Sequence, residues 1–222
     1  MNKLLSFVLL FVFSSTVFAQ HNVTHFLGIP VDGSKSEMIS KLKAKGFRYD
    51  SSADELTGEF NGTDVNIYVC TNNNKVWRIA LVDVVWTTDE NSIKSRFNRL
   101  IQQFSKNYSS RTDNSEIPHT EDISYEMLVH KKRYEAIFFQ TLKDTALFSE
   151  EVGKALASKF TQEQLESPDI EMVGKRIAAV TEYALEDLRH RPVWFMIDEK
   201  CGKYRILMYY DNEYNRANGE DL

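Results

Sequence analysis

Two cysteines are the residues of this chain with the greatest capacity for covalent chemistry. Cys70 and Cys201 could pair in an oxidising compartment, so the sequence leaves open a Cys70–Cys201 disulfide and, alternatively, two unpaired structural thiols. A nucleophilic thiol needs a neighbouring base and a lowered pKa, and no histidine adjoins either cysteine in the sequence. We therefore predict no catalytic cysteine.

Histidine and serine patterns also point away from a known catalytic or metal site. His21 and His25 are four residues apart, but Asn22 stands where a His-Glu-x-x-His zinc site carries glutamate. The chain has no Gly-x-Ser-x-Gly nucleophile turn, and Ser34 after Gly33 is explained as a helix cap. We therefore predict neither a metal site nor a cofactor.

The chain has 32 acidic residues, and no two of them stand out as a catalytic pair. The pairs Asp54-Glu55, Asp89-Glu90 and Glu150-Glu151 each fall at an expected turn or helix start, and at a helix start negative charge complements the dipole. Because spatial separation defines a glycosidase-type pair, a hydrolase with dispersed catalytic residues stays open as an alternative function.

Aromatic residues in the expected strands are the clearest candidates for a binding surface. Strand alternation must turn some of these rings away from the core, where Trp and Tyr favour contact with a protein or a glycan. The candidate surface consists of Trp77, Trp86, Tyr209 and Tyr210. The alternative is that these rings pack beneath helices. Tyr209 and Tyr210 are adjacent, so they cannot both face the same side of a strand.

The first residues of the chain predict export. Lys3 precedes an apolar run from Leu4 to Phe13, and the small residue Ala19 ends the segment, which is the pattern of a cleavable signal peptide at Met1–Ala19. The run is too short to cross a bilayer as a helix, and no later stretch approaches the required length. We therefore expect an exported protein, periplasmic or secreted, that does not span a membrane.

The charge of the chain argues against nucleic acid as a partner. Without Lys3, which belongs to the expected leader, 26 basic and 32 acidic residues give a formal charge of −6. Interspersed acidic charge gains little from counterion release at a phosphate backbone. The sequence does not fix the oligomeric state.

Residues 20–107 predict an α-β-β-β-α module. Its apolar residues recur at helical spacing in some segments and at every second position in others. Capping boxes mark the two helix starts, and Asn61-Gly62 marks a hairpin turn. Its expected elements are a loosely docked polar arm (Gln20–Phe26), a helix from Ser34 to Gly46, strands at Leu56–Phe60, Val65–Cys70 and Val76–Trp86, and a helix opened by Thr87–Glu90 that reaches Phe104.

Residues 108–222 predict a β-β-α-β-β module after a polar linker, Asn107–Glu121. The expected elements are strands at Ile123–Val129 and Tyr134–Gln140, helices at Ser149–Phe160, Thr161–Glu166 and Ile170–Leu188, and strands at Val193–Ile197 and Tyr204–Tyr210. The fold class that follows is α+β, with antiparallel sheet and helices packed on one face. The halves could form one domain and could be related modules, although no fixed period aligns them.

The segment Phe26–Gly33, which leads into the helix from Ser34 to Gly46, and the leader ending at Ala19-Gln20 resemble exported proteins of unassigned function from Bacteroidetes-type bacteria. The helix-then-hairpin order of the first half is similar to modules of beta-lactamase-inhibitor-like and outer-membrane-assembly-lipoprotein-like folds. The chain departs from assembly lipoproteins by lacking a lipobox cysteine, and from both folds in its second half. The resemblance implies a bacterial envelope setting and no particular activity.

These observations together favour an exported, non-catalytic binding protein that uses an exposed sheet face. The expected partner is an envelope protein or a glycan. Two alternatives remain open, an envelope structural or assembly factor and the hydrolase with dispersed catalytic residues.

Overall fold

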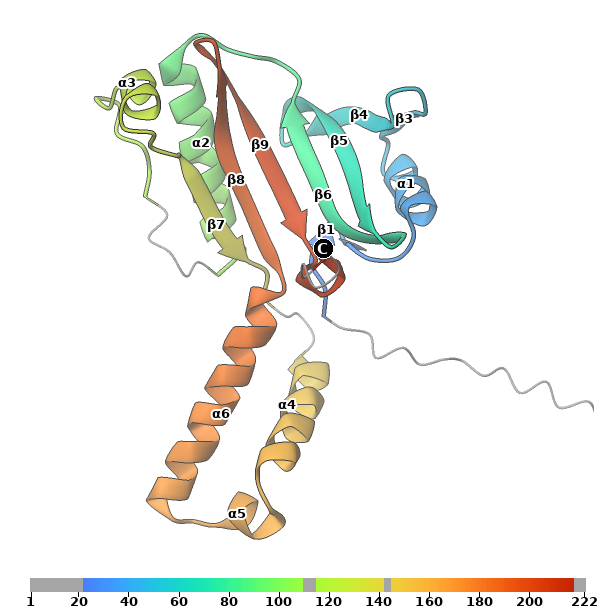
Figure 1. The fold of residues 1–222 in the computed structure, drawn as a ribbon, viewed down its shortest axis with the longest axis vertical. Helices are drawn as coiled ribbons and strands as arrows, with labels where there is room; N and C mark the ends of the chain where they lie inside the picture. Colours follow the sequence, from blue (N-terminus) through green and yellow to red (C-terminus); the bar gives the residue numbers. More distant parts are fainter. Residues whose placement is uncertain (1–21, 110–114, 142–144, 218–222) are drawn as a thin grey trace, which may run out of the picture.

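The structure is an α+β fold built on one large antiparallel sheet (Figure 1). This computed structural model describes residues 22–109, 115–141 and 145–217. The expected signal peptide, Met1–Ala19, lies outside the described residues. The predicted fold class, α+β with an antiparallel sheet, is confirmed, and α1 and α2 pack on one face of that sheet.

Strands from both halves of the chain meet in this sheet, and every neighbouring pair is antiparallel. The pair β6–β9 joins the strands of residues 20–107 to those of residues 108–222. Two further short strands, β1 (His25–Phe26) and β2 (Ile29–Pro30), form a separate hairpin. In spatial order, the strands of the large sheet are β3 (Arg48–Asp50), β4 (Glu55–Phe60), β5 (Thr63–Asn72), β6 (Lys75–Asp83), β9 (Lys203–Asp211), β8 (Pro192–Lys200) and β7 (Glu135–Phe139).

The helices begin at residues that cap them. Ser34 and Glu37 form the predicted capping box of the first helix, whereas Asp89 rather than Thr87 caps the second. The predicted box at Thr161 and Gln164 is also present. The helices are α1 (Lys35–Ala44), α2 (Glu90–Ser105), α3 (Ile123–Leu128), α4 (Thr145–Lys159), α5 (Gln162–Glu166) and α6 (Ile170–Arg189), followed by a short 3₁₀ helix, η1 (Glu213–Asn215).

One face of the sheet forms the hydrophobic core under α1 and α2. Register partners on six neighbouring strands make a continuous buried row of Leu56, Ile67, Leu81, Met208, Phe195 and Ala136. Met38 and Leu42 of α1 are fully buried in the same cluster, and the Phe97 ring of α2 lies 5.2 Å from the Phe195 ring. Burying a large apolar side chain contributes about 1.5–3 kcal/mol, so this row fixes which face is inside.

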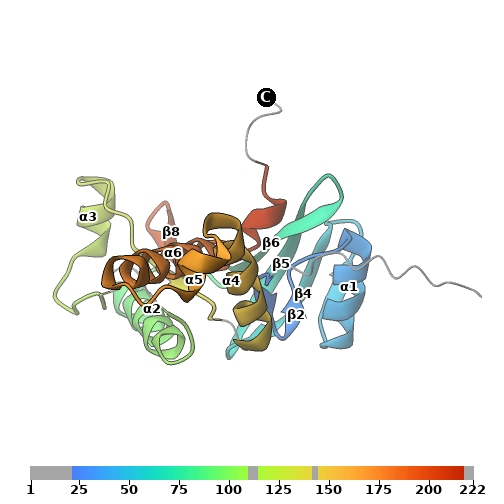
Figure 2. The same cartoon turned by 90° about the horizontal axis from the view of Figure 1, so that it is seen from below.

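The large sheet has the same strand order when it is read inward from β4 or from β7. The order β4-β5-β6 from the first half matches β7-β8-β9 from the second, β6 pairs with β9, and the first half adds β3 outside β4. The predicted turn Asn61-Gly62, at φ +57° and +74°, joins β4 to β5. The equivalent pair, β7 and β8, is joined by a long insertion that contains α4, α5 and α6. These three helices form a helical arm that projects from one end of the sheet (Figure 1) and lies in front of it when seen from below (Figure 2).

The described end of the polar segment predicted as a linker, residues 115–121, is fastened to α2. Four polar side chains of α2, spaced four residues apart, lie along one side of the helix. They form hydrogen bonds with successive residues of the segment 116–124. Gln102 contacts Glu116, Asn98 donates to and accepts from the backbone of Ile117, Lys94 donates to the carbonyls of His119 and Glu121, and Glu90 accepts from Ile123 and Ser124.

Replacing Asn98 by alanine is expected to lower the free energy of unfolding by about 2–3 kcal/mol, because it leaves the buried N–H and C=O of Ile117 without partners. Chemical denaturation of the purified protein measures this. Gln102→Ala, which removes the exposed contact of the same helix side, is the control and should cost less than about 0.5 kcal/mol. Equal losses for the two variants would contradict the role assigned to Asn98.

The predicted strand Ile123–Val129 is wrong, because this segment forms α3. Ile123, Tyr125, Met127 and Val129 alternate with other residues and suggest a strand, but Asp122 accepts a hydrogen bond from the Tyr125 N–H and caps a helix. Ile123 and Met127 then face inward at helical spacing. The second half is therefore ordered α-β-α-α-α-β-β rather than β-β-α-β-β.

Two other boundaries also differ from the prediction. The segment Gln20–Phe26 is not loosely docked in its described part, because Thr24 and Phe26 are fully buried. The Phe26 ring lies 4.9 Å from the ring of Tyr210, which ties the start of the described chain to its last strand. Strand β6 ends at Asp83, which is buried and ion-paired with Arg96, so Trp86 lies in the following loop.

Candidate functional site: the open face of the sheet

The face of the sheet opposite α1 and α2 carries a second row of register partners. Each of these residues is the sequence neighbour of a residue in the buried row, on the same side along the sheet, so alternation turns it to the other face. Among the described residues of β5, β6, β8 and β9, this row is half-buried and not packed in the core. Its members are Thr57, Asn66, Val82, Leu207, Met196 and Glu135.

A first aromatic cluster, made of Trp77, Arg78, Trp194 and Tyr209, stands at one end of this face. The Trp194 and Tyr209 rings are stacked, with centroids 4.2 Å apart. The Arg78 guanidinium lies 4.5 Å from the Tyr209 ring and 4.4 Å from the Trp77 ring. The cation is therefore held between aromatic faces, an arrangement that contributes about 0.5–2 kcal/mol for each contact.

A β-bulge puts Trp77 and Arg78 on the same side of β6. The register between β5 and β6 shifts at Cys70 and Thr71, so Trp77 is the extra residue in its strand. Val76 before it and Ile79 after Arg78 are both fully buried on the core face. Strict alternation would have turned one of the pair inward, and the bulge instead brings both to the open face.

Asp211 holds two members of the first aromatic cluster in place through its carboxylate. Its carboxylate accepts two hydrogen bonds from Arg78, at 2.6 and 2.7 Å, and a third from the Trp194 indole N–H at 2.9 Å. The Asp211 side chain is only 2% exposed. Burial alone would lower the pKa of Arg78, but the hydrogen bond to Asp211 and the negative charge of that carboxylate together raise the pKa. The guanidinium therefore stays charged, and the cluster is rigid.

A second aromatic cluster, made of Trp86, Arg205 and Asp198, stands further along the same face. The Arg205 guanidinium lies 4.1 Å from the Trp86 ring and donates to Asp198 at 2.8 Å. Asp198 and Arg205 are register partners on β8 and β9. Arg205 is four residues from Tyr209, so the two clusters lie about 13 Å apart along β9.

Between the two clusters lies an apolar strip, made of Val82, Leu207 and Met196. These residues are register partners on β6, β9 and β8, and each is half-buried. The open face therefore has an apolar centre with an aromatic and arginine cluster on either side. This pattern matches protein-binding surfaces, where Trp, Tyr and Arg carry much of the affinity.

The structure brings three of the four predicted surface residues to the open face. Trp77 and Tyr209 belong to the first aromatic cluster, and Trp86 belongs to the second. Tyr210 does not, because it is 3% exposed in the core, and burial raises the pKa of its hydroxyl well above 10. Arg78 and Arg205 were not predicted as part of this surface, and their only signal in the sequence is their position among strand aromatics.

The two cysteines do not pair in this fold. Both are free, with Cys70 on β5 and Cys201 in the turn between β8 and β9. Cys70 is opposite Arg78, which is opposite Asp211, so the register places the cysteines at different ends of the sheet, about 25–30 Å apart. Burial raises the pKa of the Cys70 thiol, which disfavours the nucleophilic thiolate at neutral pH.

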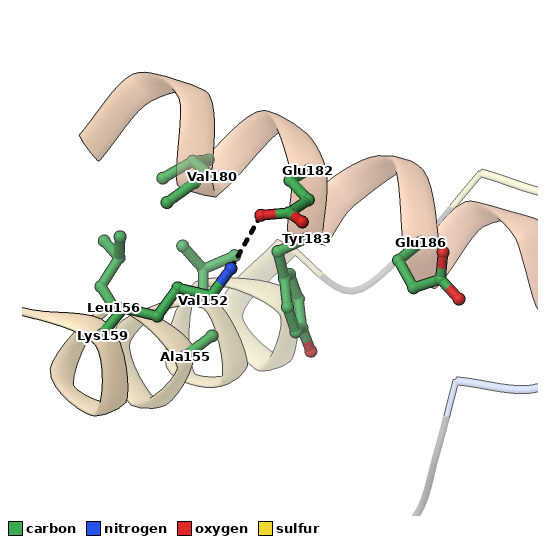
Figure 3. A pocket seen from close by; sticks show the side chains of 9 residues that line it. Val152, Ala155, Leu156, Lys159, Val180, Glu182, Tyr183 and Glu186 are labelled. Carbon is green, nitrogen blue, oxygen red and sulfur yellow. Dashed lines mark hydrogen bonds and ion pairs between the residues drawn. The ribbon is translucent and has the colours of Figure 1, made fainter. Parts of the chain in front are cut away.

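The helical arm carries a separate apolar groove of about 190 Å³ between α4 and α6 (Figure 3). Val152 and Leu156 of α4 and Val180 and Tyr183 of α6 line it, and an ion pair of 2.7 Å joins Lys159 to Glu182 at its edge. The far end of the arm is poorly buried. Ile170, the first residue of α6, is 89% exposed.

The root of the arm is held rigidly by buried polar contacts. Arg191 forms a bidentate ion pair with Asp187, and the two side chains are 3% and 5% exposed. Arg191 also donates to the carbonyls of Gln140 and Asn22, each at 3.0 Å. The Gln140 side chain bonds the backbone N–H and C=O of His25. The direction of the arm is thus fixed against the sheet and the N-terminal segment.

Comparisons with known proteins identify no match for this chain. The chain matches no protein-family model, no curated protein and no solved structure. The resemblance to exported Bacteroidetes-type proteins therefore stays a prediction.

In residues 22–109, 115–141 and 145–217, no three His, Cys, Asp or Glu side chains converge closely enough to hold a metal ion. None of the helices in these same ranges combines the length and apolar character that crossing a membrane requires.

Proposed function

We propose that this protein is an exported binding protein that holds its partner on the open face of the sheet. The observation that carries the proposal is the apolar strip between two clusters of aromatic and arginine side chains, with α1 and α2 packed on the opposite face. Such a face buries apolar area at its centre and offers Trp, Tyr and Arg contacts around it.

The rigidity of the two clusters supports this proposal. Arg78 is fixed by Asp211 and Arg205 by Asp198, so few rotamers remain to be lost when a partner binds. Each immobilised long side chain costs about 0.5–1.5 kcal/mol on association, and prior immobilisation removes that cost. The same pairing argues against nucleic acid, because the two arginines already neutralise carboxylates and have no spare charge for phosphates.

The test is a set of photocrosslinking variants expressed in the producing cells. Benzoylphenylalanine replaces Leu207 on the open face, Lys41 on the exposed side of α1, or Ile177 on the helical arm. We expect a discrete crosslinked product from the Leu207 position and none from the Lys41 position, since the partner contacts only the open face. Crosslinks from Lys41 or from Ile177 without any from Leu207 would refute the proposal.

The helical arm gives the second candidate function, an envelope assembly factor, its specific support. Ile170 and Ile177 are highly exposed on α6, which is unusual for large apolar residues without a partner. An assembly factor that joins two components needs two separate surfaces, and the arm and the open face would supply them. Distinct products from both Leu207 and Ile177 in the same experiment favour this candidate.

A further inference from the structure

The helical arm leaves its apolar side chains uncovered. Among the side chains of α4, α5 and α6 that the structure describes, only Asp187 is buried, and it is charged. Helices in proteins gain most of their stability by packing an apolar face against another element. The arm therefore presents apolar surface that a further helix would cover.

One side of α6 is an exposed stripe of apolar and small residues. Its members recur three or four positions apart, so they lie on a single side of the helix, and none of them is charged. Ile170 and Ile177 are 89% and 61% exposed. The stripe lies on the other side of α6 from the groove that Val180 and Tyr183 line. The stripe consists of Ile170, Gly174, Ile177, Ala178, Thr181 and Leu185.

The packing within the chain does not explain why residue 174 is glycine. Gly174 lies inside α6, where glycine is less stable than alanine, and a Cβ at this position would meet nothing within 4 Å. A neighbouring helix that packs closely on the stripe does explain it, because the distance between two packed helices depends on the side chains at their contact. Gly174 therefore marks a place where a partner helix comes near.

The stripe is complementary to a second copy of itself in antiparallel orientation. Ile170, Gly174, Ile177 and Thr181 are spaced four, three and four residues apart, which is the spacing of a coiled-coil seam. A two-fold axis between residues 175 and 176 places Ile177 opposite Gly174 and Ile170 opposite Thr181 in both chains. Each large side chain then meets a small one. A parallel pair would instead set the isoleucines against each other and leave a gap at Gly174.

The charges of α6 suit a like copy better than an oppositely charged partner. Each charged side chain of this helix already has a partner within the chain, so the stripe offers a neutral contact that does not repel a second acidic chain. Glu171 pairs with Lys175, Glu182 with Lys159, Glu186 with Arg189 and Asp187 with Arg191, and Arg176 donates to carbonyls of α5.

We infer that two copies of this protein associate through their arms, with the stripes of the two α6 helices packed antiparallel across a two-fold axis. Because α6 runs from the far end of the arm to the sheet, each copy carries its own sheet beyond the far end of the other arm (Figure 1). The seam from Ile170 to Thr181 is about 16 Å long, which is short for a stable interface, so we expect a reversible dimer. This inference is independent of the proposed function, because the stripe and the open face are separate surfaces.

The first test is sedimentation equilibrium of the purified protein over a range of concentrations. We expect a monomer–dimer equilibrium that Ile177→Glu weakens at least tenfold, because the variant puts a charge at the centre of the stripe. Leu128→Glu is the matched control, since Leu128 is 71% exposed on α3 and should not contribute. A protein that stays monomeric at millimolar concentration, or equal weakening by the two variants, would overturn the inference.

A pair of glycine variants separates association from folding. Gly174→Leu should weaken the dimer at least tenfold without lowering the thermal stability of the monomer, because leucine favours the helix but holds the partner away. Gly153→Leu on α4 is the control, since a Cβ there also meets nothing within 4 Å. It should leave the dimer unchanged. An unchanged dimer with Gly174→Leu would contradict close packing at this glycine.

Cysteine variants test the orientation of the two helices. Ile170→Cys and Thr181→Cys are made in separate chains that also carry Cys70→Ser and Cys201→Ser. The antiparallel pair sets position 170 opposite position 181 and separates each position from its own copy by about 16 Å, which is too far for a disulfide. We expect oxidation to crosslink the mixture of the two variants and neither variant alone. Crosslinking of each variant with itself would overturn the antiparallel arrangement.

The photocrosslinking variant at Ile177 adds a readout in the producing cells. A product that contains two copies of this chain supports the inference, whereas a product that contains only a different protein overturns it and favours the assembly factor. Flotation of the purified protein with phosphatidylglycerol vesicles, lost in Ile177→Glu, would assign the stripe to a lipid surface and overturn the inference. A dimer without any product from Leu207 refutes the proposed function alone.

Discussion

Arg191→Ala is expected to lower the free energy of unfolding by about 3–5 kcal/mol. The variant leaves the Asp187 carboxylate buried without its counterion, and it removes the donors that satisfy the carbonyls of Gln140 and Asn22. An uncompensated charge in this position costs more than the ion pair itself contributes. Chemical denaturation gives the free energy. Hydrogen exchange of α6 shows in addition whether the root of the arm opens before the sheet.

A matched control lies two residues away. Arg189 pairs with Glu186 at 3.0 Å, but both side chains are more than half exposed, so Arg189→Ala should cost less than about 0.5 kcal/mol. A double variant, Arg191→Met with Asp187→Leu, removes both charges and should recover most of the loss. Similar losses for Arg191→Ala and Arg189→Ala would show that the buried pair does not hold the root.

Arg78→Ala is expected to cost about 3 kcal/mol, because it leaves the buried Asp211 carboxylate with only the Trp194 indole as a donor. It also removes the cation from between the Trp77 and Tyr209 rings. The measurements are chemical denaturation and the tryptophan emission spectrum, since Trp77 and Trp194 both lose a close neighbour.

The second aromatic cluster provides the comparison for Arg78. Arg205→Ala breaks an ion pair with a single hydrogen bond, and the Arg205 and Asp198 side chains are 27% and 29% exposed, so the expected cost is below about 1 kcal/mol. If Arg205→Ala is as destabilising as Arg78→Ala, burial of Asp211 is not the cause of the effect.

Local signals in the sequence predict most of the individual elements. Asn61-Gly62 fixes the β4–β5 hairpin, because its two residues adopt the positive φ that the turn requires. The capping boxes at Ser34 and Thr161 mark helix starts correctly. These features depend on residues close in the chain, which is why a single sequence reveals them.

The features that the sequence does not reveal depend on distant residues. Adjacency predicts that Tyr209 and Tyr210 face opposite sides, but only the packing of Phe26 on Tyr210 decides which of them is buried. Arg78 reaches the open face because of a bulge whose position depends on the pairing of β6 with β5. The alternation that suggests a strand at Ile123 is overridden by the Asp122 cap and by the docking of α3.

The candidate site was predictable only as a set of strand aromatics. Trp77 and Tyr209 share a face because β6 and β9 are paired, and no periodicity within either strand indicates that pairing. Trp86 joins this face from the loop after β6, where its ring lies against Arg205 of β9. The contacts of Arg78 and Arg205 with these rings could not be predicted for the same reason, because they also depend on which strands pair. Their partners, Asp211 and Asp198, lie on the neighbouring strand or across a hairpin.

The central position of β9 has a consequence for how the chain reaches this fold. β6 pairs with a strand that begins at Lys203, so the middle of the sheet closes only when nearly the whole chain is available. Such distant pairing carries a large loop-closure cost and slows folding. A chain cut short before this strand would leave β6 and β8 with unpaired backbone edges, which template aggregation. Truncation near the C-terminus is therefore expected to yield insoluble protein and not a smaller working domain.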